Sequence, residues 1–436
     1  MATLEQALTV IARLERASAS EIARQLSVSQ PTVSRLLAAA GERVCRMGGG
    51  RAARYALTRP VFTLGTQVPV YRVDAEGTIH RHGVLHLLAR GHHWLELEAG
   101  PGAYFEGLPP FAADMSPQGY LGRSFTARYP ELTEVPQRIT DWSDDHRLLA
   151  LAMRGEDCTG DLILGDESLN RFLAQPPHSA QRGDYPELAR SSLSGQAGSS
   201  AGGEQPKFVT CSEGRHVLVK FSGADPSGAS QRWSDLLICE SLALRTVQAA
   251  GIPAATAHTL LIGGRRFLEV ERFDRVGRRG RRALLSLGAI DDEYFGHRDT
   301  WTKAARRLLA ARNIDAEDAR RIRWLDVFGQ LIGNTDRHFG NISFFAEDSR
   351  RFRLAPAYDM LPMVFAPVGA DVIERPFEPA PPTADTLEVW ADAARHALGY
   401  WSQLAQSAEL SAGFRERCLR CHEAVARLAA SHLHLR

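Results

Sequence analysis

The sequence predicts a multidomain α+β fold with four consecutive parts. At 436 residues the chain is longer than one ordinary domain, which favours several domains. The spacing of apolar residues changes from helical in residues 1–58 to short alternating segments in 59–165. Strands and one long helix are predicted in 166–282, and a largely helical region in 283–436. We therefore expect a helical head, a small β-rich domain and a two-lobed domain whose second lobe is mostly helical.

The composition is that of an ordinary globular protein. Hydrophobic residues make up 44% of the chain and charged residues 24%. No apolar stretch approaches the roughly 18 residues that a membrane-spanning helix needs. The six cysteines show no spacing typical of a disulfide framework, which favours a reducing compartment. We therefore expect a cytoplasmic protein without a membrane partner.

Residues 1–58 predict a winged helix-turn-helix. Apolar residues recur at helical spacing over residues 3–16, and Ser20 is expected to begin a second helix. A short turn leads to a third helix with Ser29 as its N-cap. Two short helices joined by a tight turn are typical of DNA-binding proteins, and residues 43–57 predict a hairpin that forms the wing. Helix packing without any DNA contact is the alternative interpretation.

The charge of this head favours double-stranded DNA as its partner. Residues 1–60 hold nine Arg and four Glu, whereas the formal net charge of the whole chain is only +1. We expect the start of the third helix to face the major groove and the wing to face phosphates or the minor groove. The expected contact residues are Gln30, Thr32, Ser34 and Arg35 in the helix and Arg51 and Arg54 in the wing. This interpretation also predicts a homodimer on two half-sites, associated with the nucleoid.

The alternation of apolar and polar residues, and the Gly and Pro residues that interrupt it, predict the structure of the rest of the chain. Residues 61–164 contain short alternating segments separated by Gly and Pro, which is typical of a small β-rich domain. A stretch rich in Ser, Gly and Pro over 176–206 then precedes the first strand of the two-lobed domain. The elements expected next are strands at 207–212, 216–223, 257–263 and 265–273, and a helix at 234–251.

A polar stretch, 332–345, lies between a helix-like and a strand-like segment. Its Asp336 and Asn341 have the D-x-x-x-x-N spacing of a kinase catalytic loop, in which the Asp faces the substrate hydroxyl and the Asn binds a metal. Asp359 follows beside a predicted strand, where it would be a second metal ligand. Carboxylate and amide oxygens suit Mg²⁺. The pattern therefore predicts phosphoryl transfer from ATP with Mg²⁺ as cofactor.

Residues upstream of this stretch agree with that chemistry. Only three of the 52 basic residues are lysine, which favours a specific role for a lysine on a strand of the first lobe. Lys220 lies on such a strand, and Glu240 follows in the next helix, at the separation expected of the kinase Lys to Glu ion pair. Gly202 and Gly203 allow close approach of the backbone to phosphate, although their loop is not a Walker A motif.

Each feature has a structural alternative when it is taken alone. Lys220 is then a surface residue of a strand, Glu240 a solvated charge on a helix, and Asp336 with Asn341 a capped turn. The order of the elements along the chain favours a kinase, because phosphoryl transfer needs all of these groups together.

In these motifs the sequence resembles the HipA-type serine/threonine kinases of bacterial toxin–antitoxin systems. The motifs are SSAGGEQPKF, VERFDR, GNTDRHFGN and APAYDML in the two-lobed domain and SPQGYLGR in the β-rich domain. The resemblance extends from about Val61 to the C-terminus. It is strongest to the YjjJ-like group, whose members carry an N-terminal helix-turn-helix.

The resemblance implies a bilobal, protein-kinase-like fold that transfers the γ-phosphate of ATP to a Ser or Thr of a protein. By motif, Asp336 would be catalytic, Asn341 and Asp359 would hold Mg²⁺, and Lys220 would bind phosphate. The implied ATP site comprises Gly202, Gly203, Lys220, Glu271, Phe273 and His338, with Glu271 and Phe273 at the adenine.

Regulation and partners are also implied by the resemblance. Members of the family phosphorylate an aminoacyl-tRNA synthetase, depend on a separate antitoxin, and switch themselves off by autophosphorylation of a Ser in the Gly-rich loop. That loop is one residue longer here, so the expected modified residue is Ser199 or Ser200. The head at 1–58 departs from the family pattern, because it supplies in the same chain the DNA-binding domain that relatives obtain from the antitoxin.

Two other functions are compatible with the sequence. The first is a transcriptional regulator whose kinase-like domain senses nucleotide but is catalytically silent. Intact Lys220, Asp336, Asn341 and Asp359 argue against it, because a silent domain has no chemical need to keep all four. The second is a kinase that phosphorylates a small molecule, against which the β-rich domain and the family resemblance argue.

Overall fold

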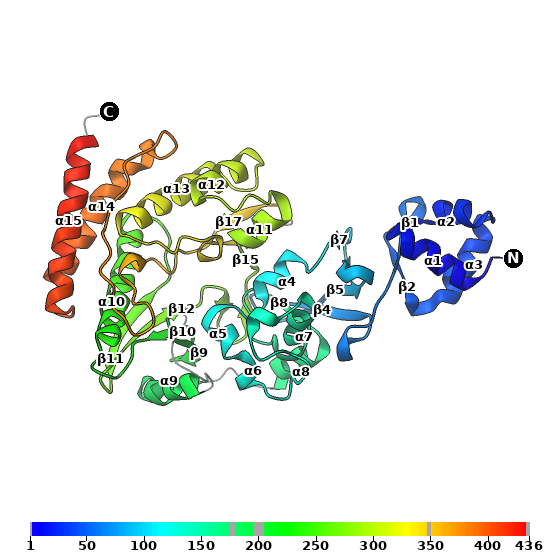
Figure 1. Ribbon diagram of the computed structural model, residues 1–436, viewed down its shortest axis with the longest axis horizontal. Coiled ribbons are helices and arrows are strands. Elements are labelled where there is room, and N and C mark those ends of the chain that lie inside the picture. Colours follow the sequence, from blue (N-terminus) through cyan, green and yellow to red (C-terminus); the bar gives the residue numbers. More distant parts are fainter. Residues whose placement is uncertain (1, 175–178, 195–204, 347–349, 433–436) are drawn as a thin grey trace. The chain divides into compact units, whose positions relative to one another are not determined.

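A computed structural model of the chain describes residues 2–174, 179–194, 205–346 and 350–432 (Figure 1). The contacts within it define two compact units. The first comprises Met1–Pro117 and Tyr129–Pro176, and the second Gln118–Arg128 and Pro177–Arg436. No helix in the described ranges is long and apolar enough to cross a membrane.

The first unit begins with three helices and a small antiparallel sheet in the order β1-β3-β2. The elements are α1 (Leu4–Leu14), β1 (Ala17–Ser18), α2 (Ala19–Leu26), α3 (Gln30–Ala40), β2 (Val44–Met47) and β3 (Arg54–Leu57). Ser18, and not Ser20, caps α2: its hydroxyl accepts a hydrogen bond from the Glu21 amide, while the Glu21 carboxylate accepts one from the Ser18 amide. This reciprocal capping box starts the helix at Ala19, one residue before Ser20.

A five-stranded antiparallel sheet in the order β7-β6-β5-β4-β8 forms the rest of the first unit. Its strands are β4 (Gln67–Val73), β5 (Ile79–Leu87), β6 (His93–Leu97), β7 (Ala103–Phe105) and β8 (Leu162–Leu164), and its main helices are α4 (Pro110–Met115), α7 (Asp144–Arg154) and α8 (Asp166–Ala174). Buried Val70 and Leu85 of the sheet pack with Leu148 of α7. The helix α8 belongs to this unit, although it follows the predicted boundary at residue 165.

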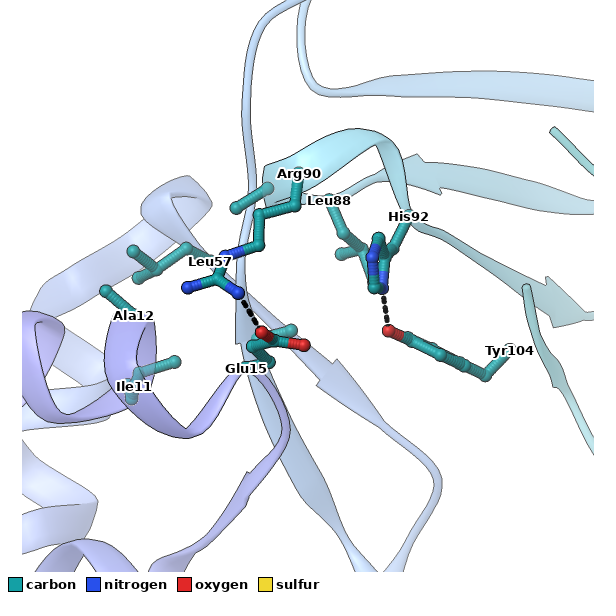
Figure 2. Close-up of a pocket in the computed structure, with 10 residues that line it drawn as sticks. Ile11, Ala12, Glu15, Leu57, Leu88, Arg90, His92 and Tyr104 are labelled. Carbon is teal, nitrogen blue, oxygen red and sulfur yellow. Dashed lines mark hydrogen bonds and ion pairs between the residues drawn. The ribbon is translucent and has the colours of Figure 1, made fainter. Parts of the chain in front are cut away.

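The head and the five-stranded sheet share a small buried cluster, which consists of Cys45, Met47, Ala56 and Leu88. Beside it, Arg90 forms an ion pair with Glu15, and both residues line a pocket (Figure 2). The head is therefore joined to the sheet by side-chain packing as well as by the chain connection.

The second unit contains a four-stranded antiparallel sheet in the order β11-β12-β10-β9. Its strands are β9 (Lys207–Ser212), β10 (Arg215–Phe221), β11 (Ala257–Ile262) and β12 (Arg265–Glu271), and its helices are α9 (Tyr185–Ser194) and α10 (Gly228–Ala249). Alternate residues of β10, Val217, Val219 and Phe221, pack with Tyr185 of α9. Because side chains alternate along a strand, Lys220 projects from the opposite face.

The remainder of the second unit is mostly helical, as predicted for the region after Arg282. The helices are α11 (Leu287–Tyr294), α12 (Trp301–Ala310), α13 (Ala316–Leu331), α14 (Leu387–Gln406) and α15 (Ala412–His432). Short strands β13 (Arg275–Val276) and β14 (Gly280–Arg281) form a hairpin before them, and β15 (Leu284–Ser286), β16 (Ser343–Ala346) and β17 (Phe352–Leu354) form a small sheet. Two short helices, α5 (Gly119–Arg123) and α6 (Phe125–Arg128), also belong to this unit.

Candidate functional site

Lys220 on β10 lies at the centre of the candidate site. Its ammonium donates hydrogen bonds to both carboxylate oxygens of Glu240, at 2.6 and 2.8 Å, and to Oδ1 of Asp359. Burial alone would lower the pKa of Lys220, but the two carboxylates raise it above its usual value. Lys220 therefore stays protonated at neutral pH, and the ion pair with Glu240 expected from the sequence spacing is present.

The two carboxylates that face Lys220 respond differently to it. Glu240 on α10 is fully buried, and this burial raises its pKa despite the nearby ammonium. Burial also acts to raise the pKa of Asp359, but attraction to Lys220 and Lys207 holds it below the usual value. Asp359 is thus the carboxylate that stays ionised most readily, as a metal ligand must.

Asp336 and Asn341 are brought together by the loop between α13 and β16. The Asn341 side-chain amide donates to the Asp336 carbonyl at 2.8 Å and to its Oδ2 at 3.4 Å. Burial raises the pKa of Asp336, and the charge of Asp359 adds to this effect. His338 lies on the same loop, with its Nε2 3.7 Å from Oδ1 of Asp336. The D-x-x-x-x-N spacing therefore corresponds to a compact loop that presents a half-exposed carboxylate.

Asp359 adopts an uncommon backbone conformation for a residue with a side chain. Its φ is +53°, in the left-handed region. The Asn334 amide donates to its carbonyl at 3.2 Å, and Lys220 engages its Oδ1. The strained backbone thus holds the carboxylate against Lys220, and such strain is common at functional sites.

The oxygen atoms left over at Asn341 and Asp359 fit a magnesium ion. Asn341 uses its amide nitrogen for Asp336, so its Oδ1 accepts no hydrogen bond from any described residue. In the same part of the chain, Oδ2 of Asp359 also accepts none. Mg²⁺ takes one or two such protein oxygens and completes its shell with waters and phosphates. These two residues could hold the metal that the sequence predicts.

Glu271 and Phe273, expected at the adenine, lie where β12 ends. Both are half-buried. The Phe273 ring packs against Tyr358, whose ring centroid is 5.8 Å away, and against Phe345 at 6.1 Å. Tyr358 precedes Asp359 and donates its hydroxyl to the Gly340 carbonyl at 2.7 Å. Phe273 and Tyr358 therefore form an aromatic wall beside Asp359, a candidate metal ligand.

The Gly-rich loop itself lies outside the described residues, and with it Ser199, Ser200, Gly202 and Gly203. The chain that follows is fixed by Gln205, which the sequence interpretation missed. Its buried side-chain amide donates to the Phe221 carbonyl at the end of β10, at 2.8 Å.

The residues expected at DNA lie on α3, in the turn between β2 and β3, and at the start of β3, and all are at least partly exposed. Gln30, Ser34, Arg35, Arg51 and Arg54 are exposed and Thr32 is half-buried. Arg51 lies in the turn between the two strands, whereas Arg54 lies on β3 and forms a 2.7 Å ion pair with Glu21. Only Arg54 among them is thus held by an acidic partner in the described part of the head.

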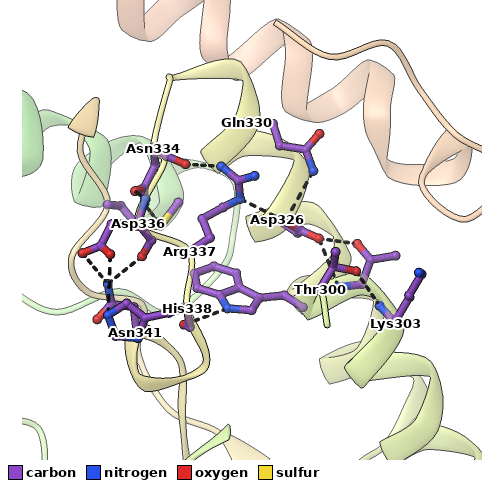
Figure 3. A network of polar contacts seen from close by, with 12 residues as sticks. Thr300, Lys303, Asp326, Gln330, Asn334, Asp336, Arg337, His338 and Asn341 are labelled. Carbon is purple, nitrogen blue, oxygen red and sulfur yellow. Dashed lines mark hydrogen bonds and ion pairs between the residues drawn. The ribbon is translucent and has the colours of Figure 1, made fainter. Parts of the chain in front are cut away.

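Three further polar residues support the candidate catalytic loop, which carries Asp336 and Asn341, and were not singled out as site residues from the sequence. They are Asp326 on α13 and Asn334 and Arg337 in the loop (Figure 3). Asp326 and Arg337 are separated by more than one helical turn and a loop, so no short motif marks them as partners.

Two family models match the chain. A model described as "YjjJ-like toxin, middle domain" matches residues 64–173, and a model described as "HipA-like C-terminal domain" matches residues 199–432. Toxin YjjJ of Escherichia coli (strain K12) is 35% identical over 431 residues, which cover 94% of this chain and 97% of that protein.

Two solved structures also match the chain. A chain of the toxin–antitoxin complex of HipA, HipB and operator DNA from Shewanella oneidensis MR-1 matches with a TM-score of 0.53 and 16% identity, over 84% of this chain and 97% of that one. The Helicobacter pylori proinflammatory kinase CtkA matches with a TM-score of 0.36 and 14% identity, over 54% and 91% of the two chains. The first likeness shows a shared fold of mixed helices and sheets.

Proposed function

The chain belongs to the family of YjjJ-like toxins with a HipA-like C-terminal domain, and from this membership we propose that it is an ATP- and Mg²⁺-dependent protein serine/threonine kinase. The observation that carries the proposal is the convergence of four groups in one place. Lys220 contacts Asp359, and Asn334 links the Asp359 backbone to the loop that holds Asp336 and Asn341. Phosphoryl transfer needs this set of a cation, metal ligands and a carboxylate near the acceptor.

Each group has a defined role in this reaction. Asp336, half-exposed on its loop, orients the acceptor hydroxyl and takes its proton. Lys220 provides a fixed positive charge for the phosphates, and Glu240 keeps that ammonium in place. Asn341 and Asp359 would hold Mg²⁺, which would supply positive charge against the phosphates. Phe273 and Tyr358 offer an apolar wall on which the adenine can rest.

We further propose that the first 58 residues form a winged helix-turn-helix that binds double-stranded DNA. Support comes from the exposed Gln30, Ser34 and Arg35 on α3 and from the positive charge of the head. The S. oneidensis complex contains HipA together with HipB and operator DNA. By analogy, an antitoxin and a DNA site are proposed as partners here, with a homodimer on two half-sites.

The kinase proposal is tested by mass spectrometry of the purified protein after incubation with ATP and Mg²⁺, beside an Asp336→Ala control. The expected result is one added phosphate in the wild type, on Ser199 or Ser200, and none in the control. If neither protein gains phosphate and neither phosphorylates an added protein, although both bind nucleotide, then the catalytically silent regulator is the better interpretation.

The DNA proposal is tested by the salt dependence of binding to selected operator fragments. Arg35→Ala should weaken binding and reduce the slope of log K against log salt by about one contact. Arg420→Ala, which removes an exposed arginine from α15, is the matched control and should change neither quantity. An unchanged slope in Arg35→Ala would show that α3 does not face the duplex.

A further inference from the structure

Asp326 is a buried carboxylate on α13 that faces the catalytic loop. It is 4% exposed and accepts four hydrogen bonds. Thr302 donates its amide and hydroxyl to Oδ2 at 3.1 and 2.7 Å, and Arg337 and Gln330 donate to Oδ1 at 3.1 and 3.4 Å. Because a buried carboxylate is tolerated only when it is paired and hydrogen-bonded, this site is built around its charge.

Arg337 connects this carboxylate to the loop between Asn334 and Asn341. Its Nε donates to Asp326, and its Nη1 donates to the Asn334 carbonyl. The side chain passes directly over Gly329, where an added Cβ would lie 2.6 Å from the Arg337 Cδ. Any larger residue at that position of α13 would force the arginine side chain to shift, so the glycine helps to keep Arg337 in this place.

Asn334 continues the connection to the two aspartates of the site, Asp336 and Asp359, and Figure 3 shows its link to Asp336. It is fully buried; its Oδ1 accepts from the Asp336 amide at 3.0 Å, and its side-chain amide donates to the Asp359 carbonyl at 3.2 Å. The position of Asn334 therefore sets the positions of the backbones that carry the Asp336 and Asp359 carboxylates.

We propose that Asp326 and Arg337 are positioning residues which, through Asn334, hold Asp336 and Asp359 at the separation that phosphoryl transfer requires. The pair is assigned no contact with substrate or nucleotide. Its loss should therefore slow the chemical step and change nucleotide affinity much less, since Phe273 and the contact of Lys220 with Glu240 are not part of the connection. This inference rests on the proposed kinase function where the test measures kcat and KM. Where the test measures hydrogen–deuterium exchange, it rests on geometry alone.

The chain offers a matched control for Asp326 on the same helix. Asp318 of α13 is 3% exposed and accepts from the Leu354 amide at 2.7 Å and from Arg321 at 3.1 Å. Asp318 therefore contacts β17 and not the catalytic loop. Asp326→Asn and Asp318→Asn thus remove equally buried charges, and only the first of them contacts the catalytic loop.

In the full-length protein, Asp326→Asn should lower kcat by about 10- to 100-fold with the KM for ATP changed by less than about threefold, as expected for misplaced catalytic groups. Asp318→Asn should leave kcat within about threefold. Arg337→Met should resemble Asp326→Asn, and Arg337→Lys, which retains the charge toward Asp326, should recover part of the rate. An equal fall in kcat in the two Asp variants, or a rise in KM alone, would overturn the proposal.

Hydrogen–deuterium exchange provides a readout that does not depend on kinase activity. Asp326→Asn and Arg337→Lys should accelerate amide exchange in residues 334–341, whereas Asp318→Asn should accelerate it near Leu354. If the wild type transfers no phosphate, the proposed function fails, but this measurement still decides the positioning role. Unchanged exchange in 334–341 of both loop-facing variants, in folded protein, would refute that role.

Discussion

Lys220 is a buried ammonium that faces two carboxylates, and this arrangement makes it structurally as well as chemically important. Its three hydrogen bonds go to Glu240 and Asp359, so its removal leaves two acidic groups facing each other. Breaking a buried ion pair by removing one partner is costly because the other charge stays behind without compensation. The energetic consequence should depend on pH, since either carboxylate can be neutralised by a proton.

Lys220→Met should lower the free energy of unfolding by roughly 3 to 5 kcal/mol at neutral pH. The pKa of buried Glu240 is already raised in the folded state, and without Lys220 it should rise further. A carboxyl group whose folded pKa exceeds its unfolded pKa favours the folded state at low pH, so the loss should shrink on acidification. Urea unfolding of the wild type and of Lys220→Met at several pH values measures this difference in the free energy of unfolding.

Lys303→Met provides the control for this substitution. Lys303 is exposed on α12, so its replacement should change stability by less than about 0.5 kcal/mol at every pH. A loss in Lys220→Met that does not vary with pH would contradict the explanation through Glu240.

The sequence predicted those parts of the site that are set by alternation and spacing. Strand β10 and helix α10 follow from local patterns, and they place Lys220 and Glu240 on facing surfaces. It did not predict the partnership of Asp326 with Arg337, because that contact depends on how the loop folds back on α13. Nor could it predict that β8 pairs with β4, since no local pattern encodes pairing across such a separation.

At the scale of elements, a buried acidic residue of β12 joins the four-stranded sheet to helix α9 by hydrogen bonds. Glu269 is 1% exposed and accepts two hydrogen bonds from Arg182, one from Arg215 and one from the Tyr185 hydroxyl. Burial acts to raise the pKa of Glu269, but Arg182 and Tyr185 hold it below its usual value. Glu269 therefore links the start of α9 to the centre of the sheet.

Glu269→Gln should destabilise the second unit by about 1 to 3 kcal/mol at neutral pH, because charge-assisted hydrogen bonds are lost inside the protein. A carboxylate with a depressed folded pKa stabilises the protein above its unfolded pKa, near 4.5. The difference between wild type and variant should thus be complete above that pH and vanish as the pH falls through the folded pKa.

The matched control is Glu187→Gln on α9, where the ion pair with Arg190 is exposed on both sides. Exposed pairs contribute little, so this variant should resemble the wild type. Urea unfolding from pH 7 down to a pH below the depressed folded pKa of Glu269 compares the three proteins, and a Glu269→Gln defect that persists at the lowest pH would count against the ionic explanation.

At the scale of the whole molecule, two compact units with separate cores lie in one chain. Each unit can respond to substitution or ligand by itself, so unfolding need not be a single two-state transition. Within the first unit, the cluster around Leu88 joins the head to the five-stranded sheet. The stability of the proposed DNA-binding part is therefore coupled to that sheet.

Leu88→Ala should destabilise the first unit by about 2 to 5 kcal/mol, the usual cost of removing a buried leucine side chain. In calorimetry, the transition of the first unit should move to lower temperature, and that of the second unit should stay in place. ATP with Mg²⁺ should raise only the second transition, which identifies it. Leu261→Ala removes an exposed leucine from β11 and should leave both transitions unchanged.

The scarcity of lysine has a practical consequence for chemical labelling. Amine acylation requires a neutral, accessible amine, and this chain offers three lysine side chains in very different settings. Lys303 is exposed on α12, Lys207 is half-buried at the start of β9, and Lys220 is buried and held protonated by its carboxylates. Mass spectrometry of the acylated protein would therefore report the state of the site from a handful of peptides: Lys303 gives the reference rate, and slower modification of Lys207 on adding nucleotide gives the occupancy.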